Sequence, residues 1–235
     1  MQIDFESLVS SLKSGITYIP NTLLLVLIPI AFSLVFGTLV AYARAEKVKV
    51  VSQIFAVFIT IYRGIPTVVA LLLYNLLFLT EYEKIQNIFH LKTSIQDIDV
   101  IWIAVFALSL QTFCLTEENL RSAFLSIDKG QWEAGYSVGM TKCQILKEII
   151  IPQLIPVAIP FLTSILVGLI KNSSIVISVG VVDILVGCTI PANVSYRFFE
   201  AYLAAALIYW VINAILEFLM GQYEKHGKRF KKEVA

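Results

Sequence analysis

The 235-residue chain has little charge. Asp, Glu, Lys and Arg make up 15% of it, hydrophobic residues make up 58%, and mean hydropathy is +0.81. A water-soluble domain of this length could not cover so much apolar surface, so the composition predicts an all-α protein that crosses a membrane several times. The net charge of +1 gives no sign of nucleic-acid binding. Cysteine is scarce too, and Cys114, Cys143 and Cys188 match no metal or disulfide spacing.

The sequence also lacks the patterns that indicate catalysis. It has no Gly-x4-Gly-Lys-Ser/Thr phosphate loop, so we do not expect this chain to hydrolyse ATP by itself. It has no His-Glu-x-x-His pattern and no nucleophile elbow. His90 and His226 are expected in a loop and a tail outside the membrane. We therefore predict no catalytic residue, no metal site and no cofactor in this chain.

Charged residues mark the ends of five predicted spans. No charge lies between Lys13 and Arg44, and Arg63 is the only charge between Lys49 and Glu81. A spanning helix needs roughly 20 apolar residues. The predicted spans cover about 20–43, 51–79 (interrupted), 98–125, 149–171 and 199–220, in one transmembrane domain of residues 1–235. The apolar piece 175–190 contains Asp183 and is too interrupted for a full span, so we predict a re-entrant or protein-buried helix there.

Lysine and arginine determine the predicted orientation. The first loop holds Arg44, Lys47 and Lys49, and the tail of residues 225–232 holds five further Lys and Arg residues. The loop of residues 81–99 is acidic overall. We therefore predict that the N-terminus lies outside and the C-terminus in the cytoplasm. The segment of about residues 126–148 would then face the cytoplasm.

That cytoplasmic segment carries the best-specified polar structure in the chain. Asp128 and Thr141 can each cap a helix, with Gln131 and Gln144 at the positions that would complete a capping box. Gly139 suits the turn between the two helices. The pattern predicts a short helix, a tight turn and a second helix leading into the fourth span.

Trp132, Tyr136 and Met140 recur at four-residue spacing and are predicted to share one helix face. Two interpretations stay open from this pattern. The residues anchor the segment at the level of the lipid headgroups, where Trp and Tyr are common. Alternatively, the helix inserts into a groove on a soluble partner.

The same segment resembles the EAA loop of ABC importer permeases. The family pattern reads Glu-Ala-Ala, a Gly four residues after the last Ala, then Ile-x-Leu-Pro. Here it reads Glu133-Ala134-Gly135, Gly139 and Ile149-Ile150-Ile151-Pro152. Further matches to the polar amino acid branch are Tyr62-Arg63-Gly64-Ile65-Pro66, Glu118-Asn119-Leu120-Arg121 and Lys171-Asn172-Ser173-Ser174-Ile175. The likeness covers about residues 21–217. Phe113 to Thr116 depart from the family's Gly-Ala-Tyr-x-Ala, so the substrate preference of relatives does not carry over.

The resemblance implies a permease subunit of a type I ABC importer for a polar amino acid, in the lipid of a bacterial inner (plasma) membrane. It implies a two-fold dimer with a second copy or a paralogue. Two ATPase subunits, which bind ATP and Mg²⁺, would dock on the cytoplasmic loops, and an extracytoplasmic binding protein would deliver the amino acid. The coupling loop would use Gln131, Trp132, Glu133, Ala134, Gly135, Tyr136, Gly139 and Met140.

Polar residues within the apolar segments are candidates for a substrate path. They are Arg63, Thr67, Gln111, Lys171, Ser173 and Ser174. A charge in the membrane costs at least ~2.5 kcal/mol on insertion scales, so Arg63 needs a partner or a watery cavity. We favour a structural role for Arg63 and a helix–helix hydrogen bond for Gln111, whereas both roles stay open for residues 171–174.

An ion-coupled secondary transporter without an ATPase is the main alternative. Such a protein predicts inverted repeats and carboxylates within the membrane. The sequence shows no repeat, and the carboxylates at membrane depth are limited to Asp183 and Glu217.

Overall fold

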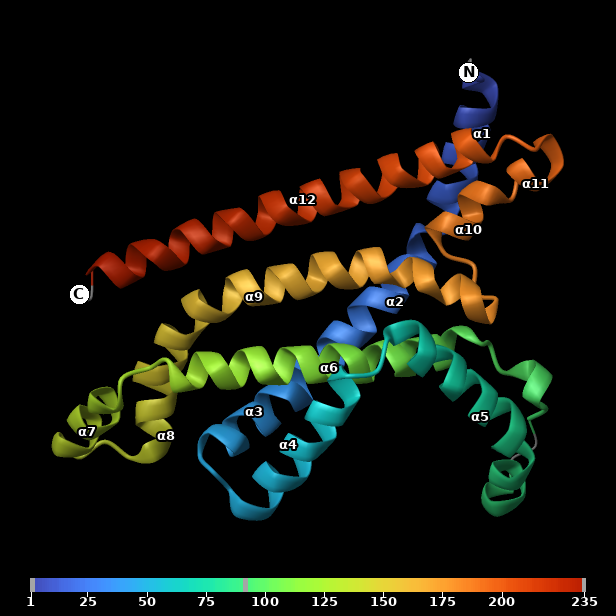
Figure 1. Cartoon of the computed structure of the whole chain (residues 1–235). Coiled ribbons are helices and arrows are strands. Elements are labelled where there is room, and N and C mark those ends of the chain that lie inside the picture. The colour runs from blue at the N-terminus through green and yellow to red at the C-terminus, as the bar shows by residue number, and fades with distance from the viewer. Residues whose placement is uncertain (1–2, 91–92, 234–235) are drawn as a thin grey trace.

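The computed structural model describes residues 3–90 and 93–233, which form helices and connecting loops (Figure 1). The α-helices are α1 (Phe5–Thr17), α2 (Ile19–Phe32), α3 (Thr38–Ala45), α4 (Lys49–Arg63), α5 (Thr67–Phe89), α6 (Ile101–Leu125), α7 (Lys129–Ser137), α8 (Lys142–Ile145), α9 (Ile151–Asn172), α10 (Ile184–Thr189), α11 (Ala192–Ser195) and α12 (Phe198–Glu233). π-Helical turns at Ser33–Gly37 and Leu146–Ile150 join α2 to α3 and α8 to α9, and 3₁₀ turns lie at Ile95–Asp97 and Ser173–Val179.

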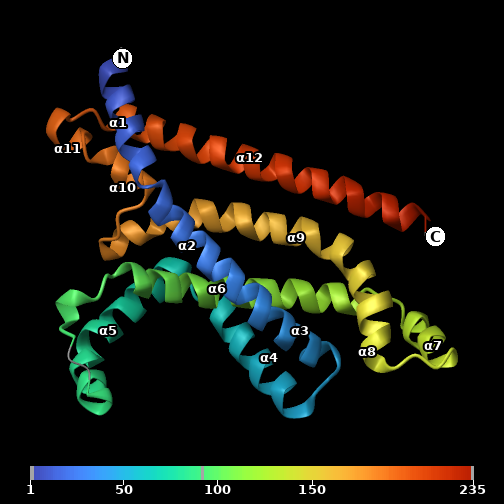
Figure 2. The same ribbon diagram turned by 180° about the vertical axis from the view of Figure 1, so that it is seen from behind.

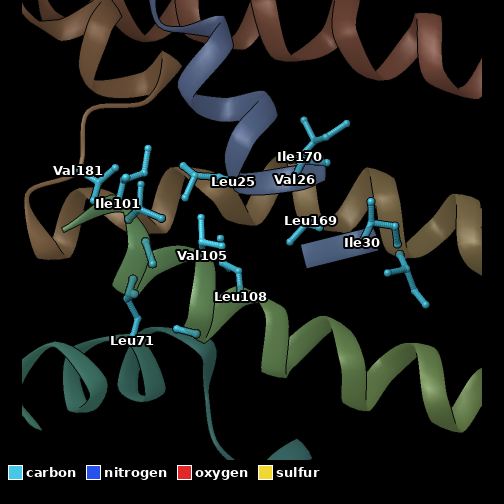
Figure 3. Packing of buried hydrophobic residues seen from close by; sticks show 14 residues of the cluster. Leu25, Val26, Ile30, Leu71, Ile101, Val105, Leu108, Leu169, Ile170 and Val181 are labelled. Atoms are coloured by element: carbon cyan, nitrogen blue, oxygen red, sulfur yellow. The ribbon is translucent and has the colours of Figure 1, made fainter. Parts of the chain in front are cut away.

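Helix α6 is the central element of the bundle. In the most apolar stretch of α6, 67% of the residues are buried, whereas in the corresponding stretch of α12 only 22% are buried. It contacts α2, α3, α5 and α9, and Figure 2 shows it crossing between them. The main apolar cluster lies along its first half (Figure 3). Its labelled members are Leu25, Val26, Ile30, Leu71, Ile101, Val105, Leu108, Leu169, Ile170 and Val181. Because lipid tails are as apolar as these side chains, close packing rather than water exclusion must hold the cluster together.

The described residues provide four continuous candidate spans of the predicted all-α fold, or five if the bent pair of α4 and α5 counts as one. Four continuous stretches are long and apolar enough to cross a membrane: Ile19–Ala45, Ile101–Leu125, Lys142–Val179 and Phe198–Tyr223. The fifth is the pair of α4 and α5, whose axes differ by 104°. Ile65 precedes Pro66, and a residue before proline disfavours the helical conformation. The predicted interruption of the second span therefore lies at Gly64–Pro66.

Several elements differ from the sequence-based expectation. Helix α5 continues to Phe89, through part of the acidic segment predicted as a loop, and α12 continues to Glu233. The side chains of the basic tail lie outside the described part of the chain. A single helix over 175–190 is wrong: a 3₁₀ turn ends at Gly180, which has φ +83°, and Asp183 begins α10 by accepting from the Val186 amide at 3.1 Å.

The first helix, α1, has no counterpart among the predicted elements. Asp4 caps it by accepting from the Glu6 amide at 3.1 Å. The helix packs against α10 and α12, and the Asp4 amide donates to buried Glu200 at 3.1 Å. In Figure 1 the N-terminus lies beside α11 and the start of α12, whereas α7 and the C-terminus lie at the opposite end.

Candidate functional site

The polar segment 126–148, called the polar loop below, is a helix–turn–helix. Thr141 and Gln144 form the predicted capping box: the Gln144 amide donates to Thr141 Oγ1 at 3.4 Å, and the Thr141 amide donates to Gln144 Oε1 at 2.8 Å. Gly139 adopts φ +83° in the turn. The Met140 amide donates to the Gly135 carbonyl at 3.1 Å across this turn, which fixes the angle between α7 and α8.

The first cap differs from its prediction. Asp128 caps α7 by accepting from the Gly130 amide at 2.6 Å, but Gln131 does not complete a capping box. Gln131 Oε1 instead accepts from Gln153 Nε2 on α9 at 3.1 Å. A contact across 22 residues therefore replaces the local one, and it ties the polar loop to the start of the fourth span.

Trp132 and Tyr136 line a cavity of about 400 Å³ between α7 and the ends of α3 and α6. Tyr42 and Phe124 form part of its far wall. The predicted face is wrong for Met140, because α7 ends at Ser137 and Met140 lies beyond the turn. Trp132 is half-buried against the transmembrane body, whereas Tyr136 has 50% of its surface exposed. The geometry therefore supports anchoring for Trp132 and leaves half of Tyr136 accessible to a partner.

The side chains left for a partner lie on the rest of α7 and its turn. Glu133 and Ala134 are exposed, and Val138 has 75% of its surface exposed. Gly135, where the family pattern has Ala, is buried against α8. A Cβ on Gly135 would lie 2.6 Å from Ile145 Cγ1, so the Ile145 side chain occupies the space of the missing methyl group.

The polar loop is also attached to the first inter-span loop. Lys142 on α8 forms an ion pair with Glu46 at the end of α3. Its ammonium lies 5.7 Å from the centre of the Tyr42 ring, within cation–π distance. These contacts place the first loop and the polar loop on one side of the bundle.

A second, buried ion pair joins α3 to α6. Arg44 Nη1 lies 2.6 Å from Glu117 Oε2 and 3.3 Å from Glu118 Oε2. The Glu117 side chain is fully buried and that of Arg44 is only 10% exposed. Glu118 also pairs with Arg121 on its own helix. Sequence patterns could not reveal the Arg44–Glu117 pair, since its members are 73 residues apart.

Replacing Arg44 with alanine is expected to destabilise the protein by roughly 3–5 kcal/mol, because the Glu117 carboxylate would stay buried without its partner. Arg121→Ala is the matched control, since it removes a partly exposed pair within one helix that contributes about 0–1 kcal/mol. Thermal unfolding of the purified variants measures both. Equal shifts in melting temperature would contradict the assignment.

A second cavity, of about 200 Å³, lies between α5, α6 and α9. The described residues that line it carry no charge. They are Thr67, Leu108, Gln111, Thr112, Leu115, Asn119, Phe161, Ser164, Ile165, Gly168, Leu169 and Asn172. Gln111 Oε1 is buried without a partner in the described chain. Thr112 and Ser164 donate their hydroxyl protons to backbone carbonyls of their own helices, so their oxygens remain acceptors.

The structure does not bring all residues of the predicted substrate path to one cavity. Thr67 and Gln111 face the same cavity. Arg63 is the exposed last residue of α4 and is not among the residues that line it. Lys171 lines a different cavity, between α9 and α12. Ser173 is buried and donates to the Ile170 carbonyl at 2.8 Å, and half-buried Ser174 donates to the Lys171 carbonyl at 2.9 Å.

Sequence reasoning missed Ser164 and Asn119 as polar lining residues. Ser164, Gly168 and Asn172 are spaced four apart on α9, and Asn119 lies on the same face of α6 as the predicted Gln111. Polar or small residues at helical spacing within two apolar spans were therefore the available signal. The Asp183 carboxylate lies elsewhere: it caps α10 and accepts from the Tyr209 hydroxyl at 2.5 Å.

Comparisons with known proteins agree with one another. Residues 16–228 match the family model described as binding-protein-dependent transport system inner membrane component. The chain is 32% identical to the probable amino-acid permease protein YxeN of Bacillus subtilis (strain 168), over 95% of both chains. It is 34% identical to the probable amino-acid ABC transporter permease protein PatM of Vibrio harveyi, over 92% of both. A crystal structure of an amino acid ABC transporter with histidines superposes with a TM-score of 0.80 at 29% identity, over 96% of this chain and 100% of that one.

Proposed function

The chain belongs to the family of binding-protein-dependent transport system inner membrane components, and on that premise we propose that it forms the translocation path of an ATP-driven amino-acid importer. It is a multi-pass inner-membrane protein. The relatives named as amino-acid permeases and the superposed amino acid ABC transporter support the substrate class.

One structural observation carries the proposed mechanism. A continuous helical stretch, Lys142–Val179, joins the polar loop to the wall of the uncharged cavity. Its first residue pairs with Glu46, and Ser164 and Asn172 line the cavity farther along. A displacement of the polar loop by a partner would therefore reach the α9 wall of the cavity along one helical stretch, which includes the π-helical turn Leu146–Ile150.

The partners follow from what this chain provides. The polar loop offers exposed Glu133, Ala134 and Val138 to an ATPase, and the separate ATPase subunits would bind ATP and Mg²⁺. Two such subunits would act on a two-fold dimer of this chain or of the chain and a paralogue. An extracytoplasmic binding protein would present the amino acid at the end of the bundle that carries α1, α10 and α11.

The uncharged cavity favours an amino acid with an uncharged side chain. Its polar lining side chains, among them Thr67, Gln111 and Ser164, would meet the ammonium group that every amino acid carries. Described residues supply no fixed charge to balance a charged side chain there. The ion-coupled alternative has less support, since Asp183 is occupied as a helix cap and as the acceptor for Tyr209.

Co-purification tests whether the polar loop binds an ATPase. The tagged chain, co-expressed with its candidate ATPase, is expected to capture that subunit from detergent-solubilised membranes. Glu133→Arg should reduce the captured ATPase, whereas Glu83→Arg, an equally exposed change at the far end of α5, should not. Failure of the unaltered chain to capture any ATPase would refute the proposal, as would undiminished capture by Glu133→Arg.

The proposed orientation, N-terminus outside and C-terminus in the cytoplasm, has its own test. In a background without the natural cysteines, a cysteine at Glu83 should react with an impermeant thiol reagent in intact cells. A cysteine at Lys129 should react only after permeabilisation. The two positions lie on exposed surfaces, so burial would not mask the result. The reverse labelling pattern would contradict this orientation.

A further inference from the structure

An apolar groove lies directly beside the polar cavity under α7. The groove has a volume of about 330 Å³ and lies between α3, α6 and α9. Its walls include Leu39, Leu120, Ile155 and Leu162. Leu39 and Ile155 are 62% and 50% exposed, so the groove opens to the outside of the bundle at the depth of the spans.

The groove and the cavity meet at one pair of rings. Tyr42 and Phe124 line both, and their ring centres are 5.6 Å apart. On one side of the rings the lining is almost wholly aliphatic. On the other side it contains Lys129, Lys142 and two glutamates. The surface therefore changes from apolar to charged at Tyr42 and Phe124, in the direction of the polar loop.

We propose that this composite surface holds one zwitterionic phospholipid, with an acyl chain in the groove and the headgroup in the cavity. The charges that line the cavity, two lysines and two glutamates, balance one another, which suits a zwitterionic headgroup. Lys129 would meet the phosphate, and Glu46, which already pairs with Lys142, would also accept from an ammonium group. Trp132 and Tyr136 also line the cavity, and such aromatic side chains are common where a membrane meets water. An apolar helix from a second copy would fill the groove but leave the charged cavity beside it unfilled.

The bound lipid would act as a structural link. It would contact α7 of the polar loop through its headgroup and α9, which lines the uncharged cavity, through its acyl chain. The site is separate from that cavity, and it does not depend on which amino acid is carried.

Lipid retention by the purified complex tests the proposal. After extensive washing in lipid-free detergent, the complex is extracted and its phospholipid quantified by mass spectrometry. Ile155→Trp, which fills the groove, should lower retained lipid about tenfold, because each methylene group that loses its site weakens binding. Ile215→Trp is the matched control on α12, at a similar exposure of 55%. Leu39→Trp fills the groove from α3 and provides a second test of the site if Ile155→Trp does not fold.

The headgroup is tested separately. Lys129→Gln should weaken binding about fivefold. Lys147→Gln, an exposed lysine outside the cavity, should change nothing. Delipidated complex should regain phosphatidylethanolamine in preference to phosphatidylglycerol from mixed vesicles.

Equal retention in Ile155→Trp and Ile215→Trp would overturn the site, and equal recovery of the two lipids would overturn the zwitterionic headgroup. A disulfide between two copies of Ile155→Cys in native membranes would show instead that a second copy covers the groove.

Discussion

Replacing Gly139 with valine is expected to abolish uptake while leaving the chain inserted in the membrane. Gly139 has φ +83°, a conformation that a β-branched residue adopts only with strain. A Cβ there would meet nothing within 4 Å, so the penalty comes from the backbone alone. The chain would relieve this strain by opening the turn closed by the Met140–Gly135 hydrogen bond. The exposed residues of α7 would then no longer be held for an ATPase.

Gly139→Asn is the matched control, since asparagine tolerates the left-handed region far better than valine. It should retain most of the uptake and most of the captured ATPase. The measurements are uptake of labelled amino acid in cells, the amount of chain in the membrane fraction, and the ATPase recovered with it. Normal uptake by the valine variant would show that the geometry of this turn does not serve coupling.

Replacing Gln111 with leucine, together with Thr67→Val, is expected to lower uptake by about tenfold to a hundredfold. Leucine removes the amide of a residue that lines the uncharged cavity. A hydrogen bond to a charged group contributes about 1.5–3 kcal/mol, and each 1.4 kcal/mol corresponds to a tenfold change. The apolar replacements keep similar volumes, so the bundle should remain intact.

Two controls make the cavity result specific. Gln53→Leu makes the same change on the exposed surface of α4, outside the cavity, and should leave uptake unchanged. ATP hydrolysis stimulated by the binding protein should persist in the cavity variant, since the polar loop is untouched. Unchanged rate and selectivity in that variant would assign recognition to the binding protein alone.

Local sequence patterns were sufficient for the features that depend on neighbouring residues. Charges at the ends of apolar runs predicted the spans, and Pro66 predicted the break in the second one. The Thr141–Gln144 box and the Gly139 turn also form as the pattern indicates. In each case the determining atoms lie within a few residues of one another.

The features that escaped prediction depend on distant contacts. Gln131 bonds to Gln153 on another helix, and Arg44 pairs with Glu117. The predicted path residues do not all line one cavity. Asn172 of α9 lines the uncharged cavity, whereas its neighbour Lys171 lines the cavity between α9 and α12. Adjacent residues on a helix point in different directions, so grouping residues 171–174 as one polar turn obscured which of them faces the path.

Reconstituted transport is the decisive measurement. The chain is placed in proteoliposomes with its ATPase inside and its binding protein outside, and accumulation of a labelled amino acid with an uncharged polar side chain is followed. We expect accumulation only when ATP, ATPase and binding protein are all present. Accumulation by this chain alone, driven by an ion gradient and indifferent to ATP, would show that it is a secondary transporter.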